Sequence, residues 1–171
     1  DVYKRQLIGL ARIARISLLT TLYGPVIVPE TVLEELRVDS DRPGACVLAD
    51  ALAKGFIEAR ALPKHRTTDL DRLSLVLDAG EAAAIVLAQA LSCHFLLIDE
   101  RRGRAIARRH GVPVVGLAGV LLAAKRHGLI EKVEPVLSAL SESGYRLSDS
   151  LVAEVLRLAD EARQDQTSRR C

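Results

Sequence analysis

The chain has 171 residues, of which 49% are hydrophobic, and its formal net charge at pH 7 is +2. This length suits one domain with a sizeable core, and the hydrophobic content excludes a disordered protein. Aromatic residues make up only 3% of the chain, which argues against a stacking platform for single-stranded nucleic acid. No apolar run approaches the ~18 residues of a membrane-spanning helix, so we expect a soluble, cytoplasmic protein with no membrane contact.

The first half of the chain alternates helical and extended patterns. Residues 1–6 match neither a strand nor an amphipathic helix continuous with residue 7 and beyond, and we expect them to be a truncated or foreign start. Pro29 opens a helix, because proline is well tolerated in a first turn. In chain order, the spacing of apolar residues predicts a helix over 7–19, a strand over 26–28, helices over 29–37 and 47–54, a strand over 56–62 and a short helix over 68–77.

The second half continues the alternation. In chain order, it predicts a helix over 81–91, a strand over 95–98, a helix over 102–110, a strand over 112–115, and helices over 117–127, 131–141 and 148–164, with a solvated tail over 164–171. Short strands that alternate with helices indicate a parallel sheet with helices on both faces. We therefore predict that residues 7–163 form one α/β domain, a three-layer α/β/α sandwich around a central sheet of short parallel strands.

The stretch from Leu77 to Arg104 places acidic residues at two informative points. Glu81 opens a helix after Gly80, and Asp99 directly follows the apolar strand over 95–98. In open α/β sheets, ligands bind outside the carboxyl ends of the strands. Two carboxylates brought together there would repel each other unless a cation lay between them, so the pattern indicates a site for a hard metal ion.

Each of these acids also has a structural explanation. A glutamate at a helix N-terminus gains about 0.3–1 kcal/mol from the helix dipole, whether or not it binds a metal. Asp99 could instead cap the basic helix that comes after it. From the pattern alone, both explanations stay open for each acid.

Four segments carry a resemblance to a known family. They are LIGLARI from Leu7, VPETVLEEL from Val28, the pair DAGEAAAIVLA and LLIDERRGR from Asp78 onward, and GYRLSDSLVAEVL from Gly144. In order and spacing they resemble the PIN-domain family of metal-dependent ribonucleases, in particular a PIN-like branch found beside small antitoxin-type genes. The similarity runs from about residue 7 to about residue 161 and covers nearly the whole chain.

The resemblance implies that three or four acids bind one or two Mg²⁺ or Mn²⁺ ions. The metal ligands and catalytic residues that it implies are Glu35, Glu81 and Asp99. Asp78 and Glu100 are neighbours that could substitute for a ligand or support one. Glu34 is the rival of Glu35, but Thr31 and Glu34 have the spacing of a capping box.

The first acid of the family pattern is missing from this chain. Its place falls near Tyr3, and neither Tyr3 nor its neighbours Val2 and Lys4 is acidic. If residues 1–6 are native, this departure favours an alternative in which the chain is a non-catalytic PIN-like module that binds RNA or an antitoxin; if they are foreign, it favours neither function. A third alternative, a small-molecule α/β enzyme, would need a deep apolar pocket.

The basic residues and the resemblance together suggest partners. Arg101, Arg104 and Arg108 share one face of a predicted helix beside Asp99, where they could contact RNA phosphates. The resemblance implies a hydrolase that cuts RNA phosphodiester bonds and leaves a 5′-phosphate. It also implies a toxin held inactive by a small antitoxin protein, often as a homodimer.

Overall fold

The computed structural model describes residues 2–161, with the backbone alone for residues 2 and 3. Within this range, four short strands pair in parallel as two separate sheets. β1 (Val26–Pro29) pairs with β2 (Ile57–Arg60), and β3 (Leu96–Leu97) pairs with β4 (Val114–Val115). The predicted α/β class with short parallel strands is confirmed.

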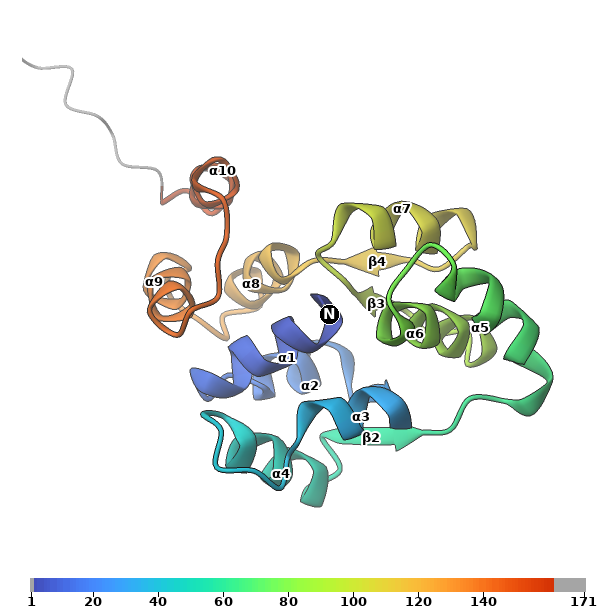
Figure 1. Cartoon of the computed structure of the whole chain (residues 1–171). Coiled ribbons are helices and arrows are strands. Elements are labelled where there is room, and N and C mark those ends of the chain that lie inside the picture. Colours follow the sequence, from blue (N-terminus) through green and yellow to red (C-terminus); the bar gives the residue numbers. More distant parts are fainter. Residues whose placement is uncertain (1, 162–171) are drawn as a thin grey trace, which may run out of the picture.

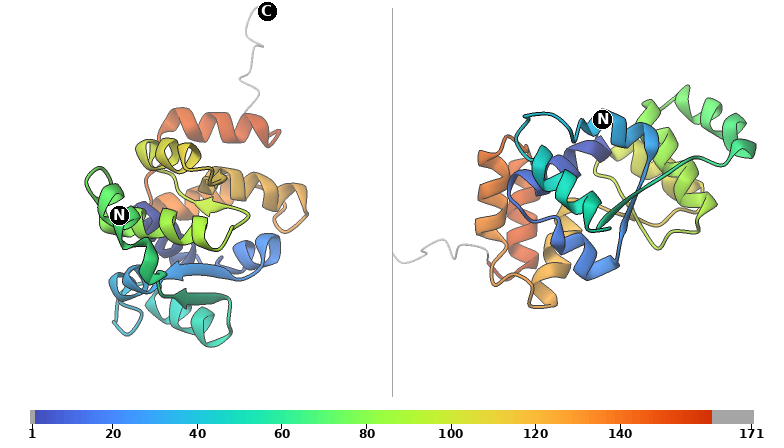
Figure 2. Two further views of the ribbon diagram at one scale, coloured as in Figure 1. Left: turned by 90° about the vertical axis from the view of Figure 1, so that its right-hand side faces the viewer. Right: turned by 90° about the horizontal axis from the view of Figure 1, so that it is seen from below.

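Helices surround both strand pairs and make up most of the structure (Figure 1). In chain order they are α1 (Val2–Arg12), α2 (Ser17–Tyr23), α3 (Glu30–Leu36), α4 (Ala45–Ala53), a 3₁₀ turn (Lys64–Arg66), α5 (Thr67–Ser74), α6 (Ala79–Ala90), α7 (Arg101–Arg109), α8 (Leu117–Arg126), α9 (Glu134–Glu142) and α10 (Asp149–Leu158). The helices α9 and α10 lie side by side at one end of the molecule, and α5 lies at the other (Figure 2). No helix within residues 2–161 is long and apolar enough to cross a membrane.

The N-terminal region differs from the prediction. Helix α1 begins at Val2, so the expectation that residues 1–6 fit no helix is wrong for residues 2–6. The single helix predicted over 7–19 is divided into α1 and α2, because Ala14 adopts a left-handed backbone with φ of 52°. The predicted tail over 164–171 lies outside the described residues.

Helix α6 forms the centre of the fold. Its residues 80–88 are all buried, which explains why the helix is apolar on nearly every face. It packs against β1 in one sheet and β3 in the other, and also against α1, α3 and α5. Glu81 lies in the first turn of α6. It is buried because the helix is enclosed on all sides.

Candidate functional site

Glu81 is a buried carboxylate in the first turn of α6. It is only 4% exposed, and its Oε1 atom has no hydrogen-bond partner among the residues that the structure describes. Burial raises the pKa of Glu81, and the nearby negative charge of Glu100 raises it further. An ionised group held in this way is unfavourable unless a cation compensates its charge.

Asp78 and Glu100 both act as helix caps. Asp78 accepts a hydrogen bond at Oδ1 from the backbone N–H of Glu81, at 2.8 Å, and so caps α6. Glu100 accepts one at Oε2 from the backbone N–H of Gly103, at 2.6 Å, and so caps α7. The cap of the basic helix is therefore Glu100, and the alternative role considered for Asp99 is wrong.

Gly103 allows α7 to approach Glu81 closely. A Cβ atom on this residue would lie 2.5 Å from Ile98 Cδ1 and 3.2 Å from Glu81 Oε1. The first of these separations is shorter than a carbon–carbon contact allows. The space around the Glu81 carboxylate therefore depends on the missing side chain at position 103.

We expect Gly103→Ala to destabilise the protein by about 1–3 kcal/mol, because the added methyl group overpacks a filled site. Urea denaturation measures this loss of stability. Gly119→Ala in α8 is a suitable control, since its Cβ would meet a single side-chain atom, on Val115, at 3.1 Å. An unchanged free energy of unfolding in Gly103→Ala would contradict the close packing.

Glu35 reaches the start of α6 from α3. Its Oε2 atom lies 3.8 Å from the position that a Cβ on Gly80 would take, and its side chain is 39% exposed. Lys4 of α1 forms an ion pair with the same carboxylate. The structure thus brings Glu35 near the helix turn that carries Glu81.

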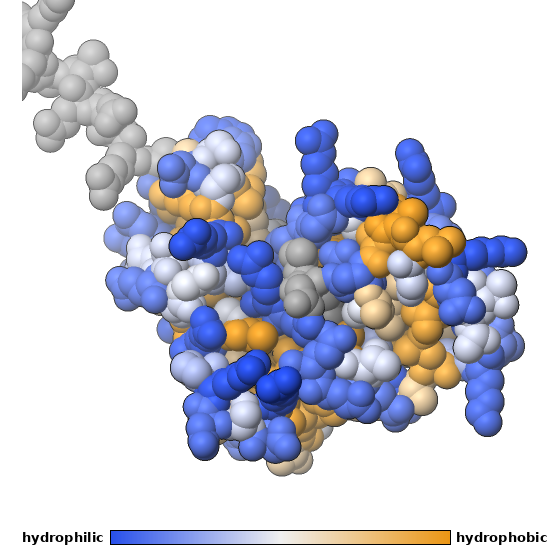
Figure 3. Space-filling model, viewed as in Figure 1, coloured by the Kyte–Doolittle hydropathy of each residue, from blue (hydrophilic) through white to orange (hydrophobic). Residues whose placement is uncertain are grey.

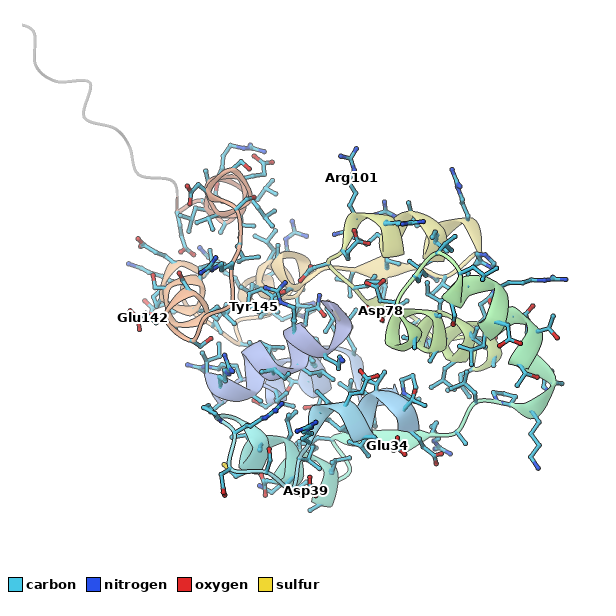
Figure 4. The ribbon with its side chains drawn as sticks, in the orientation of Figure 1. Glu34, Asp39, Asp78, Arg101, Glu142 and Tyr145 are labelled. Atoms are coloured by element: carbon cyan, nitrogen blue, oxygen red, sulfur yellow. The ribbon has the colours of Figure 1, made fainter. Side chains whose placement is uncertain are left out.

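The rival acid, Glu34, does not take part in a capping box. The N-cap of α3 is Pro29, no side chain caps this helix, and Thr31 already lies inside it. Glu34 is exposed and lies on the side of α3 away from Asp78 (Figure 4). The local role that the sequence suggested for Glu34 is wrong.

Asp99 is held by two distant segments. Its Oδ1 atom accepts a hydrogen bond from the backbone N–H of Leu117, at 2.9 Å, and its Oδ2 atom accepts one from the Tyr145 hydroxyl, at 2.5 Å. Burial raises the pKa of Tyr145, and the Asp99 charge and hydrogen bond raise it further, so the hydroxyl keeps its proton and donates.

Arg104 lies next to Asp99. A Cβ on Gly116 would lie 2.6 Å from Asp99 Oδ1 and 2.9 Å from an Arg104 guanidinium nitrogen, so both groups flank this glycine. Arg101 and Arg108 are exposed, whereas Arg104 is half-buried. Arg101 points outward from α7 (Figure 4). Hydrophilic side chains project from this part of the surface (Figure 3). Of the three predicted RNA contacts, Arg104 is therefore the one placed beside a candidate acid.

The acids do not form a complete metal cluster. Within residues 2–161, no three histidine, cysteine, aspartate or glutamate side chains are arranged to hold a metal ion together. Glu35 lies near Gly80 at the start of α6, Glu81 faces Gly103 of α7, and Asp99 lies beside Arg104 and the start of α8. The unpartnered Glu81 oxygen is the feature that fits a bound cation, and carboxylate oxygens are the donors that Mg²⁺ and Mn²⁺ take.

An apolar groove of about 280 Å³ lies away from these acids. It opens between β1 and β3, and the rings of Tyr23 and Phe95 meet beside it with centroids 5.5 Å apart. The titratable side chains that line it include Cys93 and His94. Because burial raises the pKa of the Cys93 thiol, this cysteine is a poor nucleophile. The groove offers little support for the small-molecule enzyme considered above.

Sequence reasoning assigned no role to three residues of the site: Tyr145, Gly103 and Gly116. A glycine inside the arginine-rich helix was a usable signal, because glycine weakens a helix unless close packing requires it. Tyr145 lies in a segment that carries the family resemblance, but nothing local indicates its contact with Asp99.

Comparison with known proteins identifies a family. A family model described as a PIN domain, DUF3368, matches residues 5–161, which is most of the chain and includes every candidate acid from Glu35 to Glu100. No curated protein and no solved structure shows significant similarity to the chain.

Proposed function

The chain belongs to the PIN-domain family, and from that premise we propose that it is a Mg²⁺- or Mn²⁺-dependent ribonuclease of the toxin–antitoxin type that acts in the cytoplasm. The observation that carries the proposal is the buried Glu81 carboxylate, whose Oε1 has no partner within residues 2–161. It lies against Gly103 in the arginine-rich helix α7. A hard cation would compensate this charge, and the arginines would attract RNA phosphates.

Each residue has a defined role in this proposal. Glu81, Glu35 and Asp99 would hold the ion, which when bound polarises the scissile phosphate and makes an attacking water more acidic. Arg104, half-buried beside Asp99, would hold the phosphate at the reacting bond. Arg101 and Arg108 would contact the RNA backbone farther along α7. Water would lose a proton and form a bond to phosphorus, while the bond from phosphorus to the 3′ oxygen breaks and that oxygen takes up a proton. The products would carry a 5′-phosphate and a 3′-hydroxyl.

The proposal includes a protein partner. A small antitoxin would hold the enzyme inactive by placing a peptide over the acids at the start of α6, and the toxin would form a homodimer. Arginines exposed on α7 are available to such a peptide as well as to RNA.

A second candidate function is a non-catalytic module that binds RNA or an antitoxin. Two observations favour it. Lys4 pairs with Glu35 and so supplies a cation from the chain itself. Both oxygens of Asp99 already accept hydrogen bonds, from Leu117 and Tyr145.

Calorimetric titration with Mn²⁺ tests the metal site. We expect Asp99→Asn to bind Mn²⁺ at least ~10-fold more weakly than the wild type, because a neutral amide replaces a charged ligand. Glu142→Gln, an exposed change in α9 far from Asp78 (Figure 4), should bind as the wild type does. Equal binding by the wild type and Asp99→Asn would exclude Asp99 as a ligand.

An RNA cleavage assay separates the two candidate functions. The wild type and a Tyr3→Asp variant, which restores an acid before Leu7, are incubated with RNA in Mn²⁺ or in chelator. The ribonuclease hypothesis predicts Mn²⁺-dependent cleavage by at least the restored variant. If that variant binds RNA and leaves it intact, the chain is a binding module.

A further inference from the structure

We propose that Tyr145 is a positioning residue for Asp99, whose carboxylate it holds in the orientation that a metal ligand needs. This inference rests on the proposed function, because the orientation of Asp99 matters to the reaction only if Asp99 binds the ion. The acids that the resemblance implies are Glu35, Glu81 and Asp99, and it gives no role to Tyr145, which lies between α9 and α10.

The Asp99 carboxylate is fixed through both of its oxygens. Tyr145 donates to Oδ2 at 2.5 Å, and the backbone N–H of Leu117 donates to Oδ1 at 2.9 Å. Two donors on opposite oxygens prevent the carboxylate from rotating. Each oxygen still has a second lone-pair site, so a carboxylate held in this way can also bind a cation. Metal-binding carboxylates are commonly oriented by such hydrogen bonds.

The tyrosine is itself held firmly in place. Its ring lies against α1 at Gly9, where a Cβ would come within 2.8 Å of the ring. Its backbone N–H donates to the carbonyl of Leu140, at 2.9 Å, which ties it to the end of α9. Arg12 of α1 donates to the carbonyl of Ser143, at 2.6 Å. Tyr145 is 7% exposed, so the side chain that donates to Asp99 is itself packed in the protein interior.

The position of Tyr145 in the fold connects the C-terminal helices with the candidate site. Tyr145 lies after α9 and before α10 (Figure 4), whereas Asp99 lies two residues after the end of β3. Leu117, which holds the other oxygen, begins α8. The Asp99 orientation therefore depends on α8 and on the turn between α9 and α10, and not on β3 alone.

Mn²⁺ calorimetry on four proteins tests the proposal: the wild type, Tyr145→Phe, Asp99→Asn and the double variant. Tyr145→Phe keeps the ring that packs on Gly9 and removes only the hydroxyl. We expect it to weaken Mn²⁺ binding by about 10- to 100-fold, as is usual when a group that orients a ligand is lost. In the Asp99→Asn background the same change should have no further effect, because the two residues act as one unit. Tyr23→Phe, a change beside the apolar groove, should bind Mn²⁺ as the wild type does.

Each outcome has a distinct meaning. If the wild type binds no Mn²⁺, the proposed function fails and this inference fails with it. If the wild type binds and Tyr145→Phe binds equally well, this inference alone is overturned. If Tyr145→Phe weakens binding by the same factor with and without Asp99, Tyr145 does not act through Asp99, and the positioning role is again overturned.

Tyrosine fluorescence provides a measurement that leaves Tyr145 intact. The chain has no tryptophan and three tyrosines, so a Tyr3→Phe/Tyr23→Phe protein has Tyr145 as its one fluorophore. A carboxylate acceptor quenches tyrosine emission, and a cation that shares the carboxylate should partly relieve the quenching. We expect emission to rise with Mg²⁺ in this protein and to stay constant when Asp99→Asn is added. A constant signal in both would contradict the proposal.

Discussion

Replacing Glu81 with glutamine is expected to stabilise the protein in the absence of divalent ions and to remove the stabilisation that Mn²⁺ gives the wild type. The buried carboxylate has one oxygen with no partner among the described residues. An unsatisfied buried group costs about 1–3 kcal/mol, and a neutral amide of similar shape avoids the larger cost of the charge. We therefore expect the free energy of unfolding of Glu81→Gln in chelator to exceed that of the wild type by about 1 kcal/mol near neutral pH.

Mn²⁺ should reverse this order. A ligand that binds only the folded state stabilises it by about 2.7 kcal/mol at 100 times its dissociation constant. The wild type should gain this stability, and Glu81→Gln should gain little. The wild type should therefore be the more stable of the two proteins when Mn²⁺ is present. Glu142→Gln, which changes an exposed glutamate, should behave as the wild type does in both conditions.

The pH dependence in chelator has a definite sign. Because the pKa of Glu81 is raised in the folded state, mainly by burial, the folded protein takes up this proton more readily than the unfolded chain. The wild type should lose stability as the pH rises from 4.5, the ordinary value, through the raised pKa, and Glu81→Gln should lack this loss. Equal stability of the two proteins at neutral pH in chelator would show that the Glu81 charge is compensated without a metal.

A large loss of stability is also expected when Glu161 is replaced. This residue links α9 to α8 through hydrogen bonds and an ion pair. Its carboxylate accepts hydrogen bonds from the backbone N–H groups of Val133, at 2.8 Å, and Glu134, at 2.9 Å, where α9 begins. Lys125 of α8 donates to Glu161 Oε1 at 2.6 Å, and the Glu161 side chain is only 9% exposed. One acid thus caps α9 and pairs with α8.

We expect Glu161→Gln to destabilise the protein by about 2–3 kcal/mol, because hydrogen bonds to a charged group are lost and Lys125 keeps an uncompensated charge. Urea denaturation measures this loss. Glu154→Gln is the matched control: its ion pair with Arg157 is exposed to solvent, so its loss should lower the free energy of unfolding far less than Glu161→Gln does. Similar losses in the two variants would contradict the special role of Glu161.

The contribution of Glu161 to the free energy of unfolding changes with pH in the opposite direction to that of Glu81. Burial opposes the charge of Glu161, but the hydrogen bonds from Lys125, Val133 and Glu134 outweigh it and lower the pKa below the ordinary value of 4.5. This group stabilises the folded state above pH 4.5, and the contribution is lost as the pH falls through the lowered pKa. The wild type and Glu161→Gln should therefore approach equal stability in acid.

Much of the fold is predictable from local patterns in the sequence. The alternation of helices and short strands, the start of α3 after Pro29, and the acid at the start of α6 are all present in the structure. Apolar spacing and helix-start residues act over a few neighbours along the chain, so they can be read without knowledge of the fold. The PIN-domain assignment likewise rests on short segments in a fixed order, and the family match supports it.

The environment of each acid was decided by contacts between residues far apart in the sequence. Asp99 meets Leu117 across 18 positions and Tyr145 across 46, and no local pattern encodes such pairings. Glu81 became a buried, partly unpartnered charge because α6 is enclosed by both sheets and because Gly103 lets α7 approach. The sequence by itself determined which acids stand at the ends of helices and strands. Only the tertiary structure decided which were desolvated, capped or paired, because burial and hydrogen bonding depend on segments that meet only when the chain has folded.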